Sequence, residues 1–319
     1  MSRLSRTLTL PLRLATAVRR ADSRGWPSLP RPALSVGNLA LGGRCKTPLV
    51  AALTAHAIAS GFRPAILLRG YPRVLRRAQP RVLTRLDPPR LPWTTVLSDG
   101  VSAAQSWTHA LTCGDEAAWL AAVTGVPVGA HPDRVRSAAE VLRRHPEVDL
   151  LLLDDGLQTA VRTDVEIVLV DPLRDLGTSP APGATREGDA GLPPGAWIVR
   201  LGPELQRTPG VLRDLAGRVL DPAQVGSVTV CAGVGDPASV AGLARDAGLS
   251  VIGQLPLRDH RAPTARQLAG RSGPFLITEK DAVGWAAGAG RQDCVVLGMG
   301  LTGAEAIWDR VFTLLGSQA

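Results

Sequence analysis

The feature that most limits the possible folds is a strand, loop, helix and strand that follow one another within residues 33–68. A short apolar strand is predicted at 33–36, a glycine-containing loop at 37–46, a helix at 47–60 and a second strand at 64–68. Two strands joined through a helix are normally parallel, because the helix carries the chain back to the end where the first strand began. The segment therefore predicts a βαβ unit within a parallel α/β sheet.

The pattern continues through the middle of the chain. Helices are predicted near 115–124 and 133–144, and strands at 148–153 and 165–170. Two segments interrupt this alternation, namely the arginine- and proline-rich residues 72–92 and the glycine- and proline-rich residues 176–195. We interpret both segments as excursions from the sheet.

A second alternation begins after residue 220. Its strands are predicted near 227–231, 250–254, 274–277 and 294–297, and a closing helix near 303–315. We therefore expect an α/β chain in three parts. These are an arm and linker at 1–32, a parallel-sheet domain at 33–220 and a smaller α/β domain at 221–319.

The positive charge of the chain is concentrated at its N-terminus. The net charge is +8, and residues 1–31 hold seven arginines against a single aspartate. Residues 1–20 are predicted to form a basic amphipathic helix, with Leu4, Leu8 and Leu12 at roughly helical spacing. Such a helix is typical of proteins that lie on an anionic membrane surface. A disordered or targeting segment is the alternative interpretation.

Composition disfavours several other classes of protein. Arginines and Pro11 interrupt the N-terminus too often for a signal peptide, and no uncharged apolar run reaches the roughly 18 residues of a spanning helix. The four cysteines have neither metal-site nor disulfide spacing, which indicates a cytosolic protein. A nucleic-acid enzyme that uses the basic arm is a further alternative, but the aromatic content of 3% leaves few rings for base stacking. We expect a monomer that binds no nucleic acid.

The loop before the first helix carries the strongest chemical signal. It reads Gly42-Gly43-Arg44-Cys45-Lys46-Thr47. Backbone N–H groups of such a loop, together with those of the helix N-terminus, can bind phosphate oxygens. Lysine then reaches the terminal phosphates of a nucleotide, and the threonine hydroxyl ligates magnesium. The full G-x-x-x-x-G-K-T spacing is absent, because Ala40 and Cys45 occupy the two glycine positions.

An acidic partner for this loop follows the apolar run at 150–153. The run ends at Asp154-Asp155-Gly156. Parallel sheets bind their ligands at the carboxyl ends of the strands, which is where these carboxylates would emerge. We interpret them as metal-binding residues, with a solvated turn as the alternative.

Lysine is rare in this chain. Of 36 basic residues only Lys46 and Lys280 are lysines. A chain that favours arginine so strongly is expected to keep lysine where a compact point charge is wanted. The sequence assigns no mechanistic role to Lys280.

Taken together, the motifs resemble those of the tetraacyldisaccharide 4′-kinase family, the lipid A 4′-kinases. The resemblance starts at Val36-Gly37-Asn38 and the Gly42-Gly43-x-x-Lys46-Thr47-Pro48 loop, and it extends over about residues 33–283. The further blocks, in the order of the family, are Arg69-Gly70-Tyr71, Gly114-Asp115-Glu116, Asp133-Arg134, Asp154-Asp155-Gly156-Leu157-Gln158, Gly183 with Arg186-Glu187, Gly233-Val234-Gly235-Asp236-Pro237, Asp259-His260 and Thr278-Glu279-Lys280-Asp281.

This resemblance implies a P-loop NTPase-like kinase fold with a second, smaller α/β domain. It implies transfer of the γ-phosphate of ATP, with Mg²⁺, to the 4′-hydroxyl of a tetraacyldisaccharide 1-phosphate. The substrate would be an anionic glycolipid of lipid A biosynthesis. The protein would work peripherally at the cytoplasmic face of the inner membrane, which suits the basic arm.

The resemblance also implies roles for individual residues. ATP phosphates would bind the loop of Ala40, Leu41, Gly42, Gly43, Arg44, Cys45, Lys46 and Thr47. Mg²⁺ would be held by Thr47, Asp154, Asp155 and Glu187. Asp115, backed by His260, would accept the proton of the sugar hydroxyl, while Arg134, Arg186 and Tyr71 would contact the substrate. From the residues alone, capping of the helix at 116–124 is an alternative role for Asp115.

The sequence departs from the family pattern at several positions. Cys45 stands where the family has glycine, and a positive φ there would cost on the order of 1 kcal/mol. Thr159 replaces a histidine after the Asp154 block, and Ala117 replaces a proline. A second hypothesis is therefore a degenerate member that binds nucleotide or lipid without turnover.

Overall fold

The computed structural model describes residues 25–38, 45–70, 81–83, 114–172, 196–234, 236–257, 265–271, 273–285 and 293–316. Packing divides the chain into two compact units. The first unit draws on residues 1–69, 131–206 and 301–319, and the second on residues 70–130 and 207–300. The predicted arm at 1–20 and the loop at 176–195 lie outside the described residues, as do residues 72–80 and 84–92 of the arginine- and proline-rich segment.

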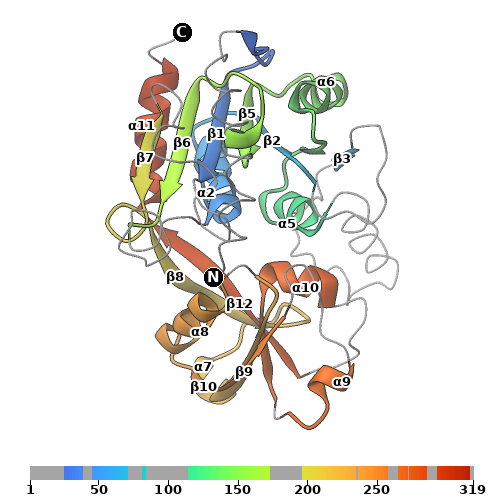
Figure 1. Ribbon diagram of the computed structural model, residues 1–319, viewed down its shortest axis with the longest axis vertical. Helices are drawn as coiled ribbons and strands as arrows, with labels where there is room; N and C mark the ends of the chain where they lie inside the picture. The colour runs from blue at the N-terminus through green and yellow to red at the C-terminus, as the bar shows by residue number, and fades with distance from the viewer. Residues whose placement is uncertain are drawn as a thin grey trace, which may run out of the picture. The chain divides into compact units, whose positions relative to one another are not determined.

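The first unit is built on a parallel sheet, as predicted (Figure 1). Neighbouring strands follow the order β2-β5-β1-β6-β7 and every neighbouring pair is parallel. The strands are β1 (Ala33–Asn38), β2 (Pro64–Leu68), β5 (Leu150–Asp154), β6 (Val165–Val170) and β7 (Trp197–Arg200). β1, β2 and β5 are buried along their whole length, which explains why they read as continuous apolar runs rather than as alternating ones.

Three α-helices belong to the described part of the first unit, and all three were expected from the sequence. They are α2 (Lys46–Ala59), α6 (Arg134–Arg144) and α11 (Ala304–Gly316). α11 packs against α2, where Nε1 of Trp308 donates to the Ser60 hydroxyl at 2.9 Å. The ring of Phe62 meets the Trp308 ring edge-on, with centroids 5.9 Å apart. The closing helix therefore covers the helix that begins at Lys46.

Two glycines allow β1 and the end of β5 to approach closely. A Cβ on Gly37 would lie 2.4 Å from the Cβ of Leu157, and a Cβ on Gly156 would lie 2.2 Å from the Ser35 hydroxyl oxygen. Neither position can take a side chain without movement of its neighbours. The backbone N–H of Asp155 donates to the Val36 carbonyl at 3.0 Å, which fixes the turn that follows β5.

The second unit carries a five-stranded sheet in the order β10-β9-β11-β12-β8. Its strands are β8 (Gln206–Asp214), β9 (Ser227–Ala232), β10 (Ser250–Pro256), β11 (Phe275–Thr278) and β12 (Cys294–Thr302). A short antiparallel pair, β3 (Arg81–Leu83) and β4 (Val128–Ala130), also belongs to this unit. Its helices are α5 (Asp115–Thr124), α7 (Pro222–Val225), α8 (Pro237–Asp246), α9 (Ala265–Leu268) and α10 (Glu279–Trp285).

The sequence did not predict β8, and its location in the sheet explains why. The strand contains Pro209 and Gly210, which are normally signs of a turn. β8 lies at the edge of its sheet, where a proline need not donate a ladder hydrogen bond. A Cβ on Gly210 would lie 2.6 Å from the Gly298 carbonyl carbon, so the glycine allows close approach to β12.

The packing units differ from the linear division expected at residue 220. The second unit begins again at residue 207, and the closing helix, expected in the C-terminal domain, belongs to the first unit. The reason is the apolar face of α11, whose buried residues Ile307, Trp308 and Val311 lie on the first unit. Of the helices in the described part of the chain, none has the length and apolar character needed to cross a bilayer.

Candidate active site

Helix α2 starts from a strained backbone position. Cys45 precedes the helix with φ 62° and ψ 15°, in the left-handed region, and its side chain is buried. Its side chain makes no capping hydrogen bond with the helix. The left-handed region favours glycine, because a Cβ crowds the neighbouring backbone there. The positive φ that would strain a side chain at the family's glycine position is thus present, with a cysteine in place of the glycine.

Lys46 projects from the first residue of α2 toward two polar partners. Its Nζ donates to the Asn38 Oδ1 at 2.7 Å and lies 3.6 Å from the Asp155 Oδ1. Asn38 is the last residue of β1 and is fully buried. The ammonium therefore sits between the ends of β1 and β5, which are adjacent and parallel. The sequence placed Asn38 in a family block without giving it a role, and its contact with Lys46 supplies one.

Thr47 joins the helix start to the acidic strand end. Its hydroxyl donates to Oδ2 of Asp154 at 2.8 Å. Asp154 is buried, and its other oxygen, Oδ1, has no hydrogen-bond partner within the described ranges. Burial raises the pKa of Asp154 to about 6, although the charge of Lys46 and the Thr47 hydrogen bond act in the opposite direction. A buried carboxylate oxygen without a partner is a group that a cation can satisfy.

The oxygens gathered here fit a magnesium ion. Mg²⁺ prefers carboxylate and hydroxyl oxygens together with phosphate and water oxygens, and it seldom takes an all-protein cage. Within the described ranges, no three His, Cys, Asp or Glu side chains gather in a way that could hold a metal ion by themselves. Thr47, Asp154 and Asp155 therefore suit a cation whose shell is completed by a nucleotide and water. Asp155 itself has φ 57°, so strained backbone occurs on both sides of this site.

Arg134 is enclosed against the same strand end. Its side chain is 1% exposed, and its guanidinium donates to the carbonyl oxygens of His131 at 2.6 Å and Asp154 at 3.4 Å. Burial lowers the pKa of Arg134 to about 10, while the charges of Asp155 and Asp154 raise it. The structure thus gives Arg134 a place in holding the end of β5. Contact with a phosphate stays a prediction.

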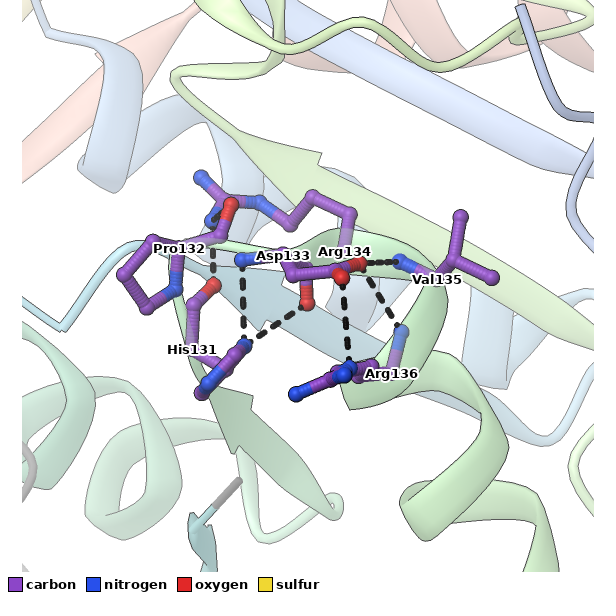
Figure 2. A network of polar contacts seen from close by, with 6 residues as sticks. All are labelled: His131, Pro132, Asp133, Arg134, Val135 and Arg136. Atoms are coloured by element: carbon purple, nitrogen blue, oxygen red, sulfur yellow. Dashed lines mark hydrogen bonds and ion pairs between the residues drawn. The ribbon is translucent and has the colours of Figure 1, made fainter. Parts of the chain in front are cut away.

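Figure 2 shows how the turn before α6 holds this arginine. Oδ1 of Asp133 accepts the backbone N–H groups of Val135 and Arg136 at 3.0 and 3.1 Å, as expected of a helix cap. The backbone N–H of Asp133 in turn donates to Nδ1 of His131 at 3.0 Å. The Asp133-Arg134 block is therefore a cap followed by a buried cation.

Asp115, the expected base, belongs to the second unit. It is the first residue of α5, after Gly114 with φ 96°, and it lies in the first turn with Glu116. Its Oδ1 accepts the backbone N–H of Glu116 at 2.9 Å, so the carboxylate satisfies one of the free N–H groups of the helix start. The N-cap itself is Gly114, so Asp115 does not cap the helix in the way weighed from the sequence, and its role in catalysis stays a prediction.

The remaining expected site residues lie outside the described residues. They are Ala40, Leu41, Gly42, Gly43, Arg44, Tyr71, Arg186, Glu187 and His260. Of the expected set, the described residues Cys45, Lys46, Thr47, Asp154, Asp155 and Arg134 are brought together in the first unit.

The parallel sheet and the helix that begins at Lys46 define a P-loop kinase fold. A crystal structure of LpxK from Aquifex aeolicus in complex with ATP has this fold, with a TM-score of 0.64 and 20% identity over 97% of this chain and 99% of that one. The family model described as tetraacyldisaccharide-1-P 4′-kinase matches residues 1–314, and the chain belongs to that family. It is therefore a member of a kinase family.

Curated relatives agree with this assignment. The tetraacyldisaccharide 4′-kinase of Shewanella denitrificans is 32% identical over 291 residues, which are 85% of this chain and 80% of the relative. That of Aeromonas salmonicida is 34% identical over the same shares of the two chains. That of Alcanivorax borkumensis is 34% identical over 272 residues, 81% of this chain and 76% of the relative.

Proposed function

We propose that this kinase transfers the γ-phosphate of ATP to the 4′-hydroxyl of a tetraacyldisaccharide 1-phosphate in lipid A biosynthesis. The names of the family and of its curated relatives support this substrate. The single observation that carries the proposal is the hydrogen bond from Thr47 to Asp154, beside Lys46. Phosphoryl transfer depends mainly on positioning and charge neutralisation, which these groups can provide.

The nucleotide would bind at the start of α2. Backbone N–H groups of the loop from Ala40 to Thr47 would hold its phosphate oxygens. The ammonium of Lys46 is already held by its hydrogen bond to Asn38. Its charge is therefore positioned beside the proposed phosphate site before the nucleotide binds. A phosphate oxygen would become an additional partner of the lysine and would balance its charge together with Asp155.

The proposed ligands of Mg²⁺ are Thr47, Asp154, Asp155 and Glu187. The bound ion would neutralise the negative charge that develops on the phosphates. The orphaned Oδ1 of Asp154 supports this assignment, because the carboxylate is buried without a hydrogen bond to that atom in the described part of the chain. Thr47 would direct an oxygen lone pair to the ion while its hydroxyl proton stays hydrogen-bonded to Oδ2 of Asp154.

The acceptor would be activated by Asp115, supported by His260. The carboxylate would take the proton of the 4′-hydroxyl as that oxygen attacks the γ-phosphorus, which is ordinary general-base chemistry. Arg186 and Tyr71 would contact the anionic glycolipid, since a guanidinium can bond two oxygens of one phosphate. Arg134 would support the same substrate contacts, because its guanidinium holds the carboxyl end of β5. The basic arm at 1–32 would rest on the cytoplasmic face of the inner membrane.

The test is a phosphoryl-transfer assay with radiolabelled ATP, Mg²⁺ and a tetraacyldisaccharide 1-phosphate in detergent micelles. Wild type is compared with Lys46→Ala, Asp115→Ala and the exposed-residue control Arg266→Ala. We expect 4′-phosphorylated product from wild type and from the control, and at least roughly 100-fold less from the two site variants. Full activity of either site variant would contradict its proposed role.

A second candidate function is nucleotide or lipid binding without turnover, which the left-handed backbone at Cys45 favours. In that case wild type would bind Mg²⁺-ATP in a manner that needs Lys46, yet give no product. Cys45→Gly separates the two, because it would restore transfer in a hindered kinase and would change nothing in a protein that only binds.

A further inference from the structure

The block Thr278-Glu279-Lys280-Asp281 starts helix α10 with a reciprocal cap. The Thr278 N–H donates to Oδ2 of Asp281 at 3.3 Å, and the Asp281 N–H donates to the Thr278 hydroxyl oxygen at 3.2 Å. This is a capping box, which satisfies two free N–H groups at once. Oδ1 of Asp281 also accepts the N–H of Gly233 at 3.1 Å, directly after β9. The start of α10 is thus fixed to the sheet of the second unit.

The two residues between the capping pair both reach α5. Oε2 of Glu279 accepts the indole N–H of Trp119 at 3.2 Å, and Nζ of Lys280 lies 3.8 Å from Oε1 of Glu116. Glu116 and Trp119 are three residues apart and therefore lie on one side of α5. Figure 1 shows α5 and α10 next to each other, in agreement with these contacts. The family block that sequence analysis left without a role is therefore a contact between two helices.

This contact uses charged groups where apolar side chains would give more stability. Burial raises the pKa of Glu279, against the hydrogen bond from Trp119 and the charge of Arg213. The Lys280–Glu116 pair is partly exposed, with side-chain exposures of 20% and 33%, so it contributes little to stability. Directional pairs of this kind are better suited to fixing the register of one helix against another.

What the contact fixes is the start of α5. Asp115 is its first residue and directly precedes Glu116, whose N–H it accepts at 2.9 Å. A displacement of this turn would move the carboxylate by a similar amount. Misplacement of a reacting group by about 1 Å is enough to cost a large part of a rate.

We infer that Lys280 is a positioning residue, which holds the first turn of α5 through Glu116 so that Asp115 is placed for proton transfer. The inference rests on the proposed function, because it gives Asp115 the role of the base. In this scheme Lys280 acts through Glu116. The compact ammonium of one of the two lysines in the chain suits a pair with a single carboxylate.

The experiment measures kcat, the KM for ATP and amide hydrogen exchange over residues 114–124 in the full chain. The variants are Lys280→Met, the conservative Lys280→Arg, Glu116→Gln and the double variant Lys280→Met/Glu116→Gln. Arg266→Met removes an exposed charge from another helix of the same unit and serves as the control.

We expect Lys280→Met to lower kcat by roughly 2–5-fold, as the loss of a partly exposed ion pair allows, and to speed exchange in the first turn of α5. The KM for ATP should change by less than about twofold, because the proposed nucleotide site belongs to the other unit. Lys280→Arg should recover most of the rate. The double variant should be no slower than the slower single variant, since both remove the same pair.

An unchanged kcat in Lys280→Met would overturn the inference, and so would losses in the two single variants that simply multiply in the double variant. Failure of the proposed function looks different. Wild type would then form no product, or Asp115→Ala would retain full activity, while the exchange data would still report whether Lys280 holds α5. Faster exchange with a normal kcat would mean that the contact is structural only, and would equally overturn the positioning role.

Discussion

The hydroxyl of Thr47 donates a 2.8 Å hydrogen bond to Oδ2 of Asp154, which leaves Oδ1 of the same buried carboxylate without a hydrogen bond among the described residues. The contact joins the first turn of α2 to the carboxyl end of β5. A negative charge is therefore kept, at a cost to folding, at the place where the proposed metal and nucleotide would bind.

Replacing Asp154 by asparagine should separate stability from activity. Asp154→Asn keeps an acceptor for Thr47 and removes a buried charge, so the free energy of unfolding at neutral pH should rise by about 1–3 kcal/mol. Phosphoryl transfer should fall by roughly 100-fold or more. Urea unfolding and the radiolabel assay measure the two effects. Asp164→Asn, which alters the acceptor of the Ala33 N–H at the start of β1, is the control that should keep its activity.

The backbone at Cys45 gives a second prediction. Cys45→Gly removes the Cβ that crowds the left-handed conformation, whereas Cys45→Ala keeps it. The glycine variant should therefore be more stable than the alanine variant by about 1 kcal/mol, measured by chemical unfolding of both. An alanine variant that is the more stable of the two would show that this position is not strained.

Arg134 should contribute more to the free energy of unfolding than an exposed arginine on the same helix does. Arg134→Met removes the donors to the carbonyls of His131 and Asp154 and should lower the free energy of unfolding by about 2–4 kcal/mol. Arg136 lies on the same helix with its side chain 68% exposed. Arg136→Met should change stability by less than about 1 kcal/mol. Equal losses in the two variants would argue against a buried structural cation.

The Glu279 carboxyl predicts a dependence of stability on pH. Burial raises its pKa above the usual 4.5, although the Trp119 hydrogen bond and the Arg213 charge oppose the shift. The folded state therefore holds this proton to a higher pH than the unfolded chain does. Stability from this group is present below pH 4.5 and is lost as the pH rises through the raised pKa.

Glu279→Gln cannot titrate and keeps an acceptor for the Trp119 indole. Relative to wild type, this variant should gain stability as the pH rises from about 4 to about 7. Urea unfolding of both proteins at several pH values measures this difference. Asp281, whose pKa is also raised by burial, is present in both proteins, so the difference isolates Glu279. A gain by wild type over the same range would contradict the prediction.

Local patterns predicted most of the secondary structure because the central strands are buried on both faces and the helices are bounded by glycine or by capping residues. The strand at 165–170 and the helix at 115–124 have the predicted bounds. The edge strand β8 was not predicted, because Pro209 and Gly210 are residues typical of a turn. The short strands β3, β4 and β7 were also not predicted, since three or four residues carry too little periodicity. The interpretation of residues 72–92 as an excursion was wrong at 81–83, where β3 pairs with β4.

The site was predictable to the extent that it lies in contiguous motifs. Lys46, Thr47 and Asp154 stand out by residue type and by their place at strand ends, and the structure brings them together. The contacts of Asn38 with Lys46 and of Lys280 with Glu116 were not predictable from spacing. They depend on which strands become neighbours and on how one helix packs on another, and no local pattern encodes either.

The place of α11 has a consequence for how the protein is made. The unit that contains Lys46 is assembled from three separate stretches, and the last begins at residue 301. A nascent chain therefore carries its proposed nucleotide site while the whole second unit is synthesised, before the helix that covers α2 leaves the ribosome. The kinase unit becomes complete only once residues 301–316 have been made, so a chain released before them would lack the cover over α2 and would be a substrate for chaperones or proteases.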